Sequence, residues 1–167
     1  MKRTLIIVRH AKSSWQDAEM KDYDRPLNDR GKRDAPVMAD IMTKQEDKPD
    51  RIVSSGAKRA LTTAGHYAKA FGLDDSSIKV DDRIYEAAVS DLIAVINDFD
   101  DVWGKVILFG HNPGFSYLVQ YLSGQMIQMP TNGVVRFDID IDSWKHIGTN
   151  CAELKYHDFP KKNSELL

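Results

Sequence analysis

The feature of the sequence that most constrains the fold is an alternation of short apolar segments with longer segments of helical periodicity. Residues 5–8 and 106–109 are continuously apolar, as are strands that are buried on both faces of a sheet. Strands that alternate with helices form a mostly parallel sheet with helices on both faces. We therefore expect an α/β fold, a three-layer αβα sandwich with a central, mostly parallel sheet. The predicted strands are residues 4–8, 51–54, 106–110, 134–139 and 152–156, with a short one at 78–80.

Four segments between these strands have the periodicity of amphipathic helices. The first contains Pro36, where we expect the helix to kink or restart, because proline lacks an amide hydrogen. The residues expected to begin or end these helices are Asn28 for the first, Gly72 for the second (57–71), Ser90 for the third, and Asn112, Pro113 and Gly124 for the fourth.

Length and composition narrow the class of protein. A chain of 167 residues suits one domain, which we place at residues 1–160, with a frayed tail at 161–167. The formal net charge of −2 provides no basic field for nucleic acid or a membrane surface. A single cysteine, Cys151, excludes an intrachain disulfide and a multi-cysteine zinc site. The apolar run near the start is too short for a signal peptide or a membrane span, so we expect a cytoplasmic protein.

Basic side chains follow three predicted strands at the point where each strand ends. Arg9-His10 ends the first, Arg59 lies in the first turn of the helix after the second, and His111 follows the third. The carboxyl ends of parallel strands share one edge of a sheet, so we expect these residues to meet there. Arginine forks and helix N-termini both favour phosphate oxygens. The sequence therefore predicts a phosphoryl-binding site that needs no metal.

The two histidines indicate which reaction this predicted site would catalyse. A neutral imidazole is a good nucleophile, and neighbouring arginines disfavour its protonated form. We expect His10 to attack phosphorus, to form a phosphohistidine, and to release phosphate by reaction with water. Taken singly, a histidine after a strand is more often a cap or a packing residue, and an arginine is usually a solvated charge. The functional interpretation depends on their convergence at one edge.

Four segments of the chain, in order, resemble the signature segments of the histidine phosphatase superfamily. They span residues 4 to about 124, which is most of the chain, and the short length together with the Arg25 segment is similar to the small bacterial phosphohistidine phosphatase branch. The resemblance implies a phosphoglycerate-mutase-like fold. The segments are residues 5–15, similar to the Arg-His-Gly strand, 25–31, similar to the Arg-Pro-Leu segment, 54–64, similar to the Ser-x-x-x-Arg segment, and 109–113, similar to the second-histidine segment.

The resemblance also implies roles for the matched residues. His10 would be the nucleophile, and Arg9, Arg59 and His111 would bind and polarise the phosphoryl group. Arg25 would be the additional cation of the small branch. The remaining candidates are Ser13, Gln16 and Asn112 for substrate binding, with Gln16 in place of the asparagine of many relatives, and Glu86 for proton donation.

Glu86 and Ala11 are two positions at which the comparison with the family pattern leaves alternatives or shows a difference. Many relatives protonate the leaving oxygen with an acid after the middle strand, and Glu86 is the candidate here. A phosphohistidine substrate needs less help, because imidazole leaves more readily than an alkoxide, and the alternative for Glu86 is a surface carboxylate near a helix start. Ala11 replaces the usual glycine, which is tolerable at negative φ but narrows the approach to the phosphate.

Two functional classes stay open. The first is a phosphatase that acts on phosphohistidine in a protein or on a small phosphoester, and the second is a non-catalytic phosphate or phosphoprotein binder. The presence of His10 favours the enzyme, because a binder need not retain the nucleophile. We expect no cofactor, no metal, and a phosphorylated protein or small phosphorylated metabolite as partner, and the sequence does not indicate an oligomeric state. Residues 15–23 and 125–133 are expected to decide the substrate.

Overall fold

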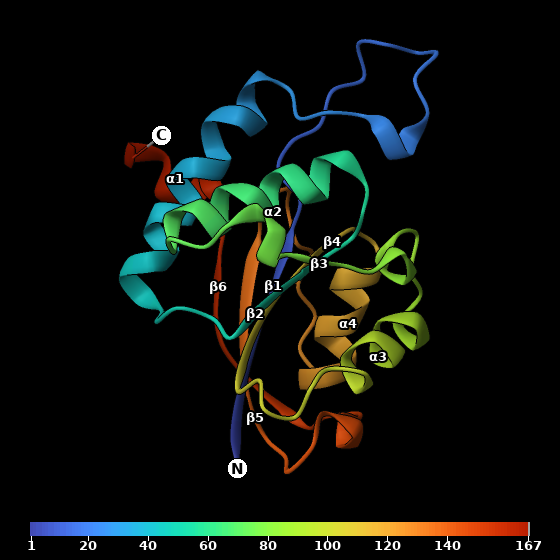
Figure 1. The fold of residues 1–167 in the computed structure, drawn as a ribbon, viewed down its shortest axis with the longest axis vertical. Coiled ribbons are helices and arrows are strands. Elements are labelled where there is room, and N and C mark those ends of the chain that lie inside the picture. Colours follow the sequence, from blue (N-terminus) through green and yellow to red (C-terminus); the bar gives the residue numbers. More distant parts are fainter. Residues whose placement is uncertain (167) are drawn as a thin grey trace.

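The computed structural model describes residues 1–166 and contains one sheet between two layers of helices (Figure 1). Its strands and α-helices are β1 (Lys2–Arg9), α1 (Asp29–Gln45), β2 (Arg51–Ser54), α2 (Lys58–Ala70), β3 (Lys79–Val80), α3 (Val89–Asn97), β4 (Lys105–Gly110), α4 (Gly114–Ser123), β5 (Val134–Asp140) and β6 (Ala152–Asp158). Short 3₁₀ helices lie at η1 (Asp22–Asp24), η2 (Asp75–Ser77), η3 (Asp82–Ile84), η4 (Trp144–His146) and η5 (Pro160–Leu166).

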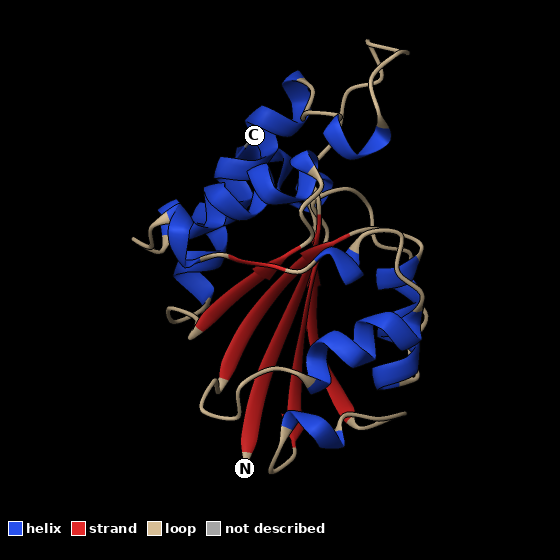
Figure 2. Cartoon of the chain, turned by 45° about the vertical axis from the view of Figure 1, so that its right-hand side comes forward, coloured by secondary structure: helices blue, strands red, loops and turns tan. Residues whose placement is uncertain are grey.

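The sheet has six strands in the order β3-β2-β4-β1-β5-β6. Strands β3, β2, β4 and β1 pair in parallel, and β5 runs antiparallel to both β1 and β6. Helices α1 and α2 cover one face, and α3 and α4 cover the other (Figure 2). The predicted three-layer α/β fold with a mostly parallel sheet is therefore confirmed.

Strand β1 contributes to the hydrophobic cores on both faces of the sheet. Ile6 and Val8 pack with the core under α1 and α2, whereas Leu5 and Ile7 pack with the core under α3 and α4. All four side chains are fully buried. The continuous apolar run at residues 5–8 is thus explained by burial on both faces.

Helix α1 runs through Pro36 without interruption, so a restart at this residue is wrong, whereas the kink expected as the alternative stays a prediction. The missing amide hydrogen leaves the carbonyl of Lys32 without its helical partner. The start of α1 is as expected, because the side chain of Asn28 accepts a hydrogen bond from the amide of Gly31 at 2.9 Å.

Two other helix starts differ from the prediction by one or two residues. Helix α3 begins before Ser90, with Ala88 as its N-cap residue, because the carboxylate of Asp91 accepts a hydrogen bond from the amide of Ala88 at 2.9 Å. Helix α4 begins just after Pro113, which is the N-cap residue, and the side chain of Asn112 bonds to the first turn from outside the helix.

Residues Pro160–Leu166 form 3₁₀ turns after β6, and the frayed tail expected at 161–167 stays a prediction. Asn163 Nδ2 donates to Asp158 Oδ1 at 2.7 Å and to the Phe159 carbonyl at 3.1 Å, which holds these turns against the end of β6. Residue 167 lies outside the described residues. Among the helices that the structure describes, none is both long and apolar enough to cross a bilayer.

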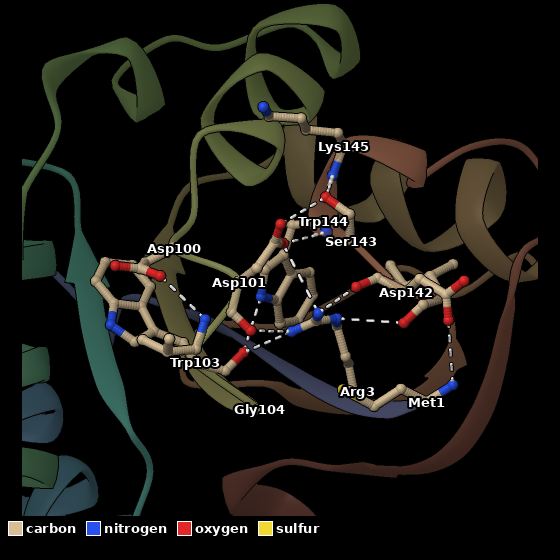
Figure 3. Close-up of polar contacts among 12 residues, drawn as sticks. Met1, Arg3, Asp100, Asp101, Trp103, Gly104, Asp142, Ser143, Trp144 and Lys145 are labelled. Atoms are coloured by element: carbon tan, nitrogen blue, oxygen red, sulfur yellow. Dashed lines mark hydrogen bonds and ion pairs between the residues drawn. The ribbon is translucent and has the colours of Figure 1, made fainter.

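Arg3 forms a buried network at the end of the sheet where β1 begins (Figure 3). Its side chain is 2% exposed, and its guanidinium lies 5.4 Å from the ring centroid of Trp144. The network ties β1 to the segments that follow α3 and β5. The guanidinium donates to four backbone carbonyls at 2.6–3.3 Å, those of Asp101, Trp103, Ile141 and Asp142.

Candidate active site

The carboxyl ends of β1, β2 and β4 lie next to one another, and they bring two histidines together. β4 pairs with both β1 and β2, and Arg9 is in register with Gly110. The ring centroids of His10 and His111, which follow these strands, are 5.3 Å apart. The long segment between β1 and α1 extends beyond this edge of the sheet, at the top of Figure 1.

One ring nitrogen of His10 forms a hydrogen bond to the backbone, and the other has no hydrogen-bond partner among the described residues. Its Nδ1 lies 2.7 Å from the carbonyl oxygen of Ala11, so Nδ1–H donates this hydrogen bond and the Nε2 lone pair is available for attack. Burial lowers the pKa of His10 to about 3, and His111, Arg59 and Arg9 act in the same direction. The ring is therefore neutral at pH 7, as a nucleophile requires.

Ala11 occupies the family's glycine position without backbone strain. It is not among the residues with positive φ, and it is fully buried. Its amide donates to Thr63 Oγ1 at 3.0 Å, while its carbonyl accepts from His10. The backbone of Ala11 therefore orients the nucleophile from a conformation that alanine adopts freely.

Three buried nitrogen atoms of the residues expected at this site have no hydrogen-bond partner within residues 1–166. They are Arg9 Nε, Arg59 Nε and His111 Nδ1. A buried polar group without a partner costs about 1–3 kcal/mol, and an acceptor that bonded to these three atoms would remove this cost. The positive charge of Arg59, together with burial, lowers the pKa of Arg9. An anion with several oxygens, such as a phosphoryl group, would bond to these atoms and offset the repulsion.

Asn112 and Arg9 share one backbone carbonyl. Arg9 Nη1 and Asn112 Nδ2 both donate to the carbonyl oxygen of Met129, each at 2.9 Å. The other side of the Asn112 amide accepts from the amide and hydroxyl of Ser116 at 3.2 and 3.0 Å. Asn112 therefore fixes the segment that holds Arg9, and both ends of its side chain are engaged within the protein.

Asp22 is a central residue of the site that the sequence analysis missed. Its carboxylate accepts from Tyr85 Oη at 2.6 Å, Arg59 Nη2 at 2.9 Å and Arg25 Nε at 3.0 Å. Burial alone would raise the pKa of Asp22, but these hydrogen bonds hold it well below its ordinary value. Four acids stand between residues 17 and 24, and no spacing distinguishes Asp22 from the others.

Ser13 acts through Arg25. Arg25 Nη1 donates to Ser13 Oγ at 2.8 Å and to the carbonyl of Ser14 at 3.1 Å. The guanidinium carbon of Arg25 lies 3.4 Å from the ring centroid of Trp15, and the indole is 71% exposed. The hydroxyl of Ser13 thus holds the guanidinium of Arg25 in place.

Gln16 and Glu86 line two different pockets. Gln16 is exposed and borders a separate groove with Pro26 and Leu27, so the structure does not bring it to the histidine pair. Glu86 borders a cavity of about 490 Å³ that His111 also lines. Glu86 has a φ of 53°, a strained conformation for a residue with a side chain, and such strain is often found at functional sites.

The geometry suits an anion better than a cation. Within residues 1–166, no three His, Cys, Asp or Glu side chains are grouped as metal ligands. The histidine pair is instead surrounded by arginines, and burial followed by the charge of Arg59 lowers the pKa of His111 to about 4. The arrangement can therefore bind a phosphoryl group, present a neutral imidazole to phosphorus, and stabilise the negative charge on the oxygens during transfer.

Comparison with known proteins identifies a family for this chain. The model of the histidine phosphatase superfamily (branch 1) matches residues 5–94. An uncharacterized chloroplastic protein of Arabidopsis thaliana is 30% identical over 152 residues, which cover 86% of this chain and 69% of that protein.

Solved structures show the same fold. The putative phosphohistidine phosphatase SixA from Agrobacterium tumefaciens superposes with a TM-score of 0.79 at 25% identity, over 95% of this chain and 98% of that chain. The protein histidine phosphatase SixA in complex with tungstate has a TM-score of 0.78 at 22% identity, over 96% and 99% of the two chains. The chain therefore belongs to branch 1 of the histidine phosphatase superfamily and is a phosphatase.

Proposed function

We propose that this phosphatase hydrolyses phosphohistidine on a protein through a covalent phosphohistidine intermediate on His10, without a metal. The observation that carries the proposal is the free Nε2 of His10 beside three buried nitrogens that have no partner. The similar SixA structure in complex with tungstate supports it, because tungstate is an oxyanion like phosphate. The 25% identical structure from Agrobacterium tumefaciens, described as a putative phosphohistidine phosphatase, also supports it.

The reaction would proceed in two displacements at phosphorus. In the first, the lone pair of His10 Nε2 forms a bond to phosphorus while the bond to the leaving group breaks, and the leaving group keeps the electron pair. The carbonyl of Ala11 stabilises the positive imidazole through Nδ1–H. In the second, a water oxygen bonds to phosphorus, the P–Nε2 bond breaks, and phosphate departs. Arg9, Arg59 and His111 would bond to the phosphoryl oxygens in both steps.

The leaving group decides whether a proton donor is needed. An imidazole protonated by solvent leaves as a neutral molecule, so a phosphohistidine substrate needs little help. An alkyl phosphate would leave as a poor alkoxide, and Glu86, which borders the cavity beside His111, is the proposed donor in that case. This difference makes the choice of substrate testable.

Exposed aromatic side chains beside the site favour a protein substrate over a small metabolite. Trp15 is 71% exposed and stacks on Arg25, and Tyr117 is 59% exposed and lines the cavity with His111. Aromatic side chains of this kind are enriched at protein interfaces. A small phosphorylated metabolite is the alternative substrate, and a non-catalytic phosphate-binding module is the alternative function.

The test compares wild type with His10→Ala for phosphate release from a protein that carries phosphohistidine and from an aryl phosphate, both in the presence of a chelator. His146→Ala is the matched control, because His146 is an exposed histidine in η4. We expect activity in wild type and in the control, its loss in His10→Ala, and a preference for the phosphoprotein. Equal release by wild type and His10→Ala would disprove the nucleophile, and absence of release from both substrates would favour the binding module or a metabolite phosphatase.

A further inference from the structure

Ser55 lies in the turn between β2 and α2, where its side chain contacts the second histidine of the site. Its hydroxyl oxygen is 2.9 Å from Nε2 of His111. The same oxygen accepts a hydrogen bond from the amide of Ala57 at 3.1 Å. Ser55 is fully buried and His111 is 8% exposed, so this contact is shielded from water. The direction of this hydrogen bond depends on which nitrogen of the ring carries the proton.

The hydroxyl hydrogen of Ser55 has one acceptor in the described part of the chain, namely Nε2 of His111. With the imidazole proton on Nε2, this hydrogen would be buried without an acceptor, at a cost of about 1–3 kcal/mol. With the proton on Nδ1, Oγ–H donates to Nε2 and the amide of Ala57 donates to Oγ. The second arrangement satisfies every polar atom of Ser55.

The tautomer of His111 decides what the ring offers to a ligand. At pH 7 the ring is neutral, because burial and Arg59 lower the pKa of His111 to about 4, and it therefore carries a single N–H. Nδ1 is buried without a partner, so it is the nitrogen left for a ligand. An Nδ1–H group would donate to a phosphoryl oxygen, whereas an Nδ1 lone pair would repel it.

We propose that Ser55 is a positioning residue that holds His111 in the Nδ1–H tautomer, so that the free N–H donates to a phosphoryl oxygen. Its consequence for catalysis rests on the proposed function, whereas the tautomer itself does not. The role resembles that of the outer hydrogen-bond partners that fix the tautomer of functional histidines in other proteins.

The first test measures the tautomer directly, by long-range ¹H–¹⁵N correlation NMR of the histidine rings at pH 7. We expect His111 of wild type to show a protonated Nδ1 and an unprotonated Nε2, and Ser55→Ala to move the population toward Nε2–H. Ser54→Ala is the matched control, because Ser54 is equally buried and donates to the carbonyl of Ser55 at 2.9 Å without contacting His111. A wild-type ring protonated on Nε2, or a Ser55→Ala spectrum identical to wild type, would overturn the proposal.

The second test measures the consequence for ligand binding and turnover. We expect Ser55→Ala to weaken the binding of inorganic phosphate and to lower kcat/KM about 10–100-fold, as is typical for loss of an outer hydrogen-bond partner. Ser55→Cys keeps the side-chain size but has only a weak donor, so it should fall between wild type and Ser55→Ala in both measurements. Unchanged phosphate affinity in both variants would overturn the proposed role in binding. If wild type lacks phosphatase activity altogether, the proposed function fails, and the NMR result still decides the tautomer.

Discussion

Arg59 bonds to Asp22 with both of its terminal nitrogens, to the backbone carbonyl at 2.7 Å and to the carboxylate at 2.9 Å. Its Nε is buried and has no partner. Asp22 therefore engages one side of the guanidinium and leaves Nε–H for a ligand. The same carboxylate bonds to Arg25, so one acid from η1 holds two cations of the site before any phosphate is bound.

Replacement of Asp22 by alanine should make the stability of the protein depend more strongly on bound phosphate. The change leaves Arg25 and Arg59 with unpaired donors and unbalanced charge, so we expect the free energy of unfolding to fall by about 1–3 kcal/mol. Inorganic phosphate should raise the Tm of this variant more than that of wild type, because the anion replaces part of the lost charge. Thermal unfolding with and without phosphate measures both effects.

Asp24→Ala is the matched control, because Asp24 is exposed in the same 3₁₀ helix. We expect its stability to lie within about 0.5 kcal/mol of wild type and its response to phosphate to be unchanged. An equal phosphate-induced shift in Asp22→Ala and wild type would show that Asp22 does not compensate the charge of the site.

Glu86→Gln should slow the turnover of ester substrates more than the turnover of phosphohistidine. The amide cannot donate a proton as an acid does, so we expect kcat for an alkyl phosphate to fall by about 10²-fold or more. Turnover of a protein that carries phosphohistidine should change little, because its leaving group needs less protonation. Steady-state kinetics with both substrates test this, with Glu153→Gln on β6 as the control. An equal loss with both substrates would assign Glu86 to substrate binding instead.

The two site histidines should make the protein less stable in mild acid. Their pKa values are lowered from 6.5 to about 3 for His10 and about 4 for His111, so below pH 6.5 the unfolded chain binds more protons than the folded one. The two neutral histidines therefore contribute their full share of the free energy of unfolding above pH 6.5. This contribution is lost as the pH falls toward 4, and the free energy of unfolding then falls by up to ~1.4 kcal/mol per pH unit for each histidine. Urea denaturation from pH 7 to pH 4.5 measures this slope.

The same experiment with His111→Gln should give a shallower pH dependence, because one of the two titrating groups is removed. His146→Ala, at an exposed position, should leave the slope as in wild type. NMR titration of the histidine rings provides a direct check, in which His10 and His111 should stay neutral down to pH 5. A midpoint near 6.5 for either ring would contradict the burial argument.

The sequence predicts the residues of the site whose positions follow from the topology. His10, Arg59 and His111 stand just after strand ends, and in a parallel sheet such positions meet whatever the loops do. Asp22 and Tyr85 could not be found in this way, because their contact joins two irregular segments that are 63 residues apart. Side-chain contacts of this kind depend on loop conformation, which periodicity does not encode.

Two local helix signals in the sequence are overridden in the structure. Pro36 does not interrupt α1, which continues to Gln45 although the carbonyl of Lys32 loses its helical partner there. Ser90 is a good N-cap residue, but the carboxylate of Asp91 bonds to an earlier amide and starts α3 before it. Gln16, which stands where many relatives have asparagine, borders another groove, and its role in substrate binding stays a prediction.

Arg3→Lys should lower stability without changing catalysis, because Arg3 and His10 lie at opposite ends of β1. Lysine keeps the charge but cannot bond to four carbonyls at once, so we expect the free energy of unfolding to fall by about 2–4 kcal/mol. Arg33→Lys, an exposed change on α1, should cost less than about 0.5 kcal/mol. Urea denaturation and kcat/KM well below the unfolding transition test both parts. A fall in kcat/KM with unchanged stability would mean that Arg3 influences the site across the sheet.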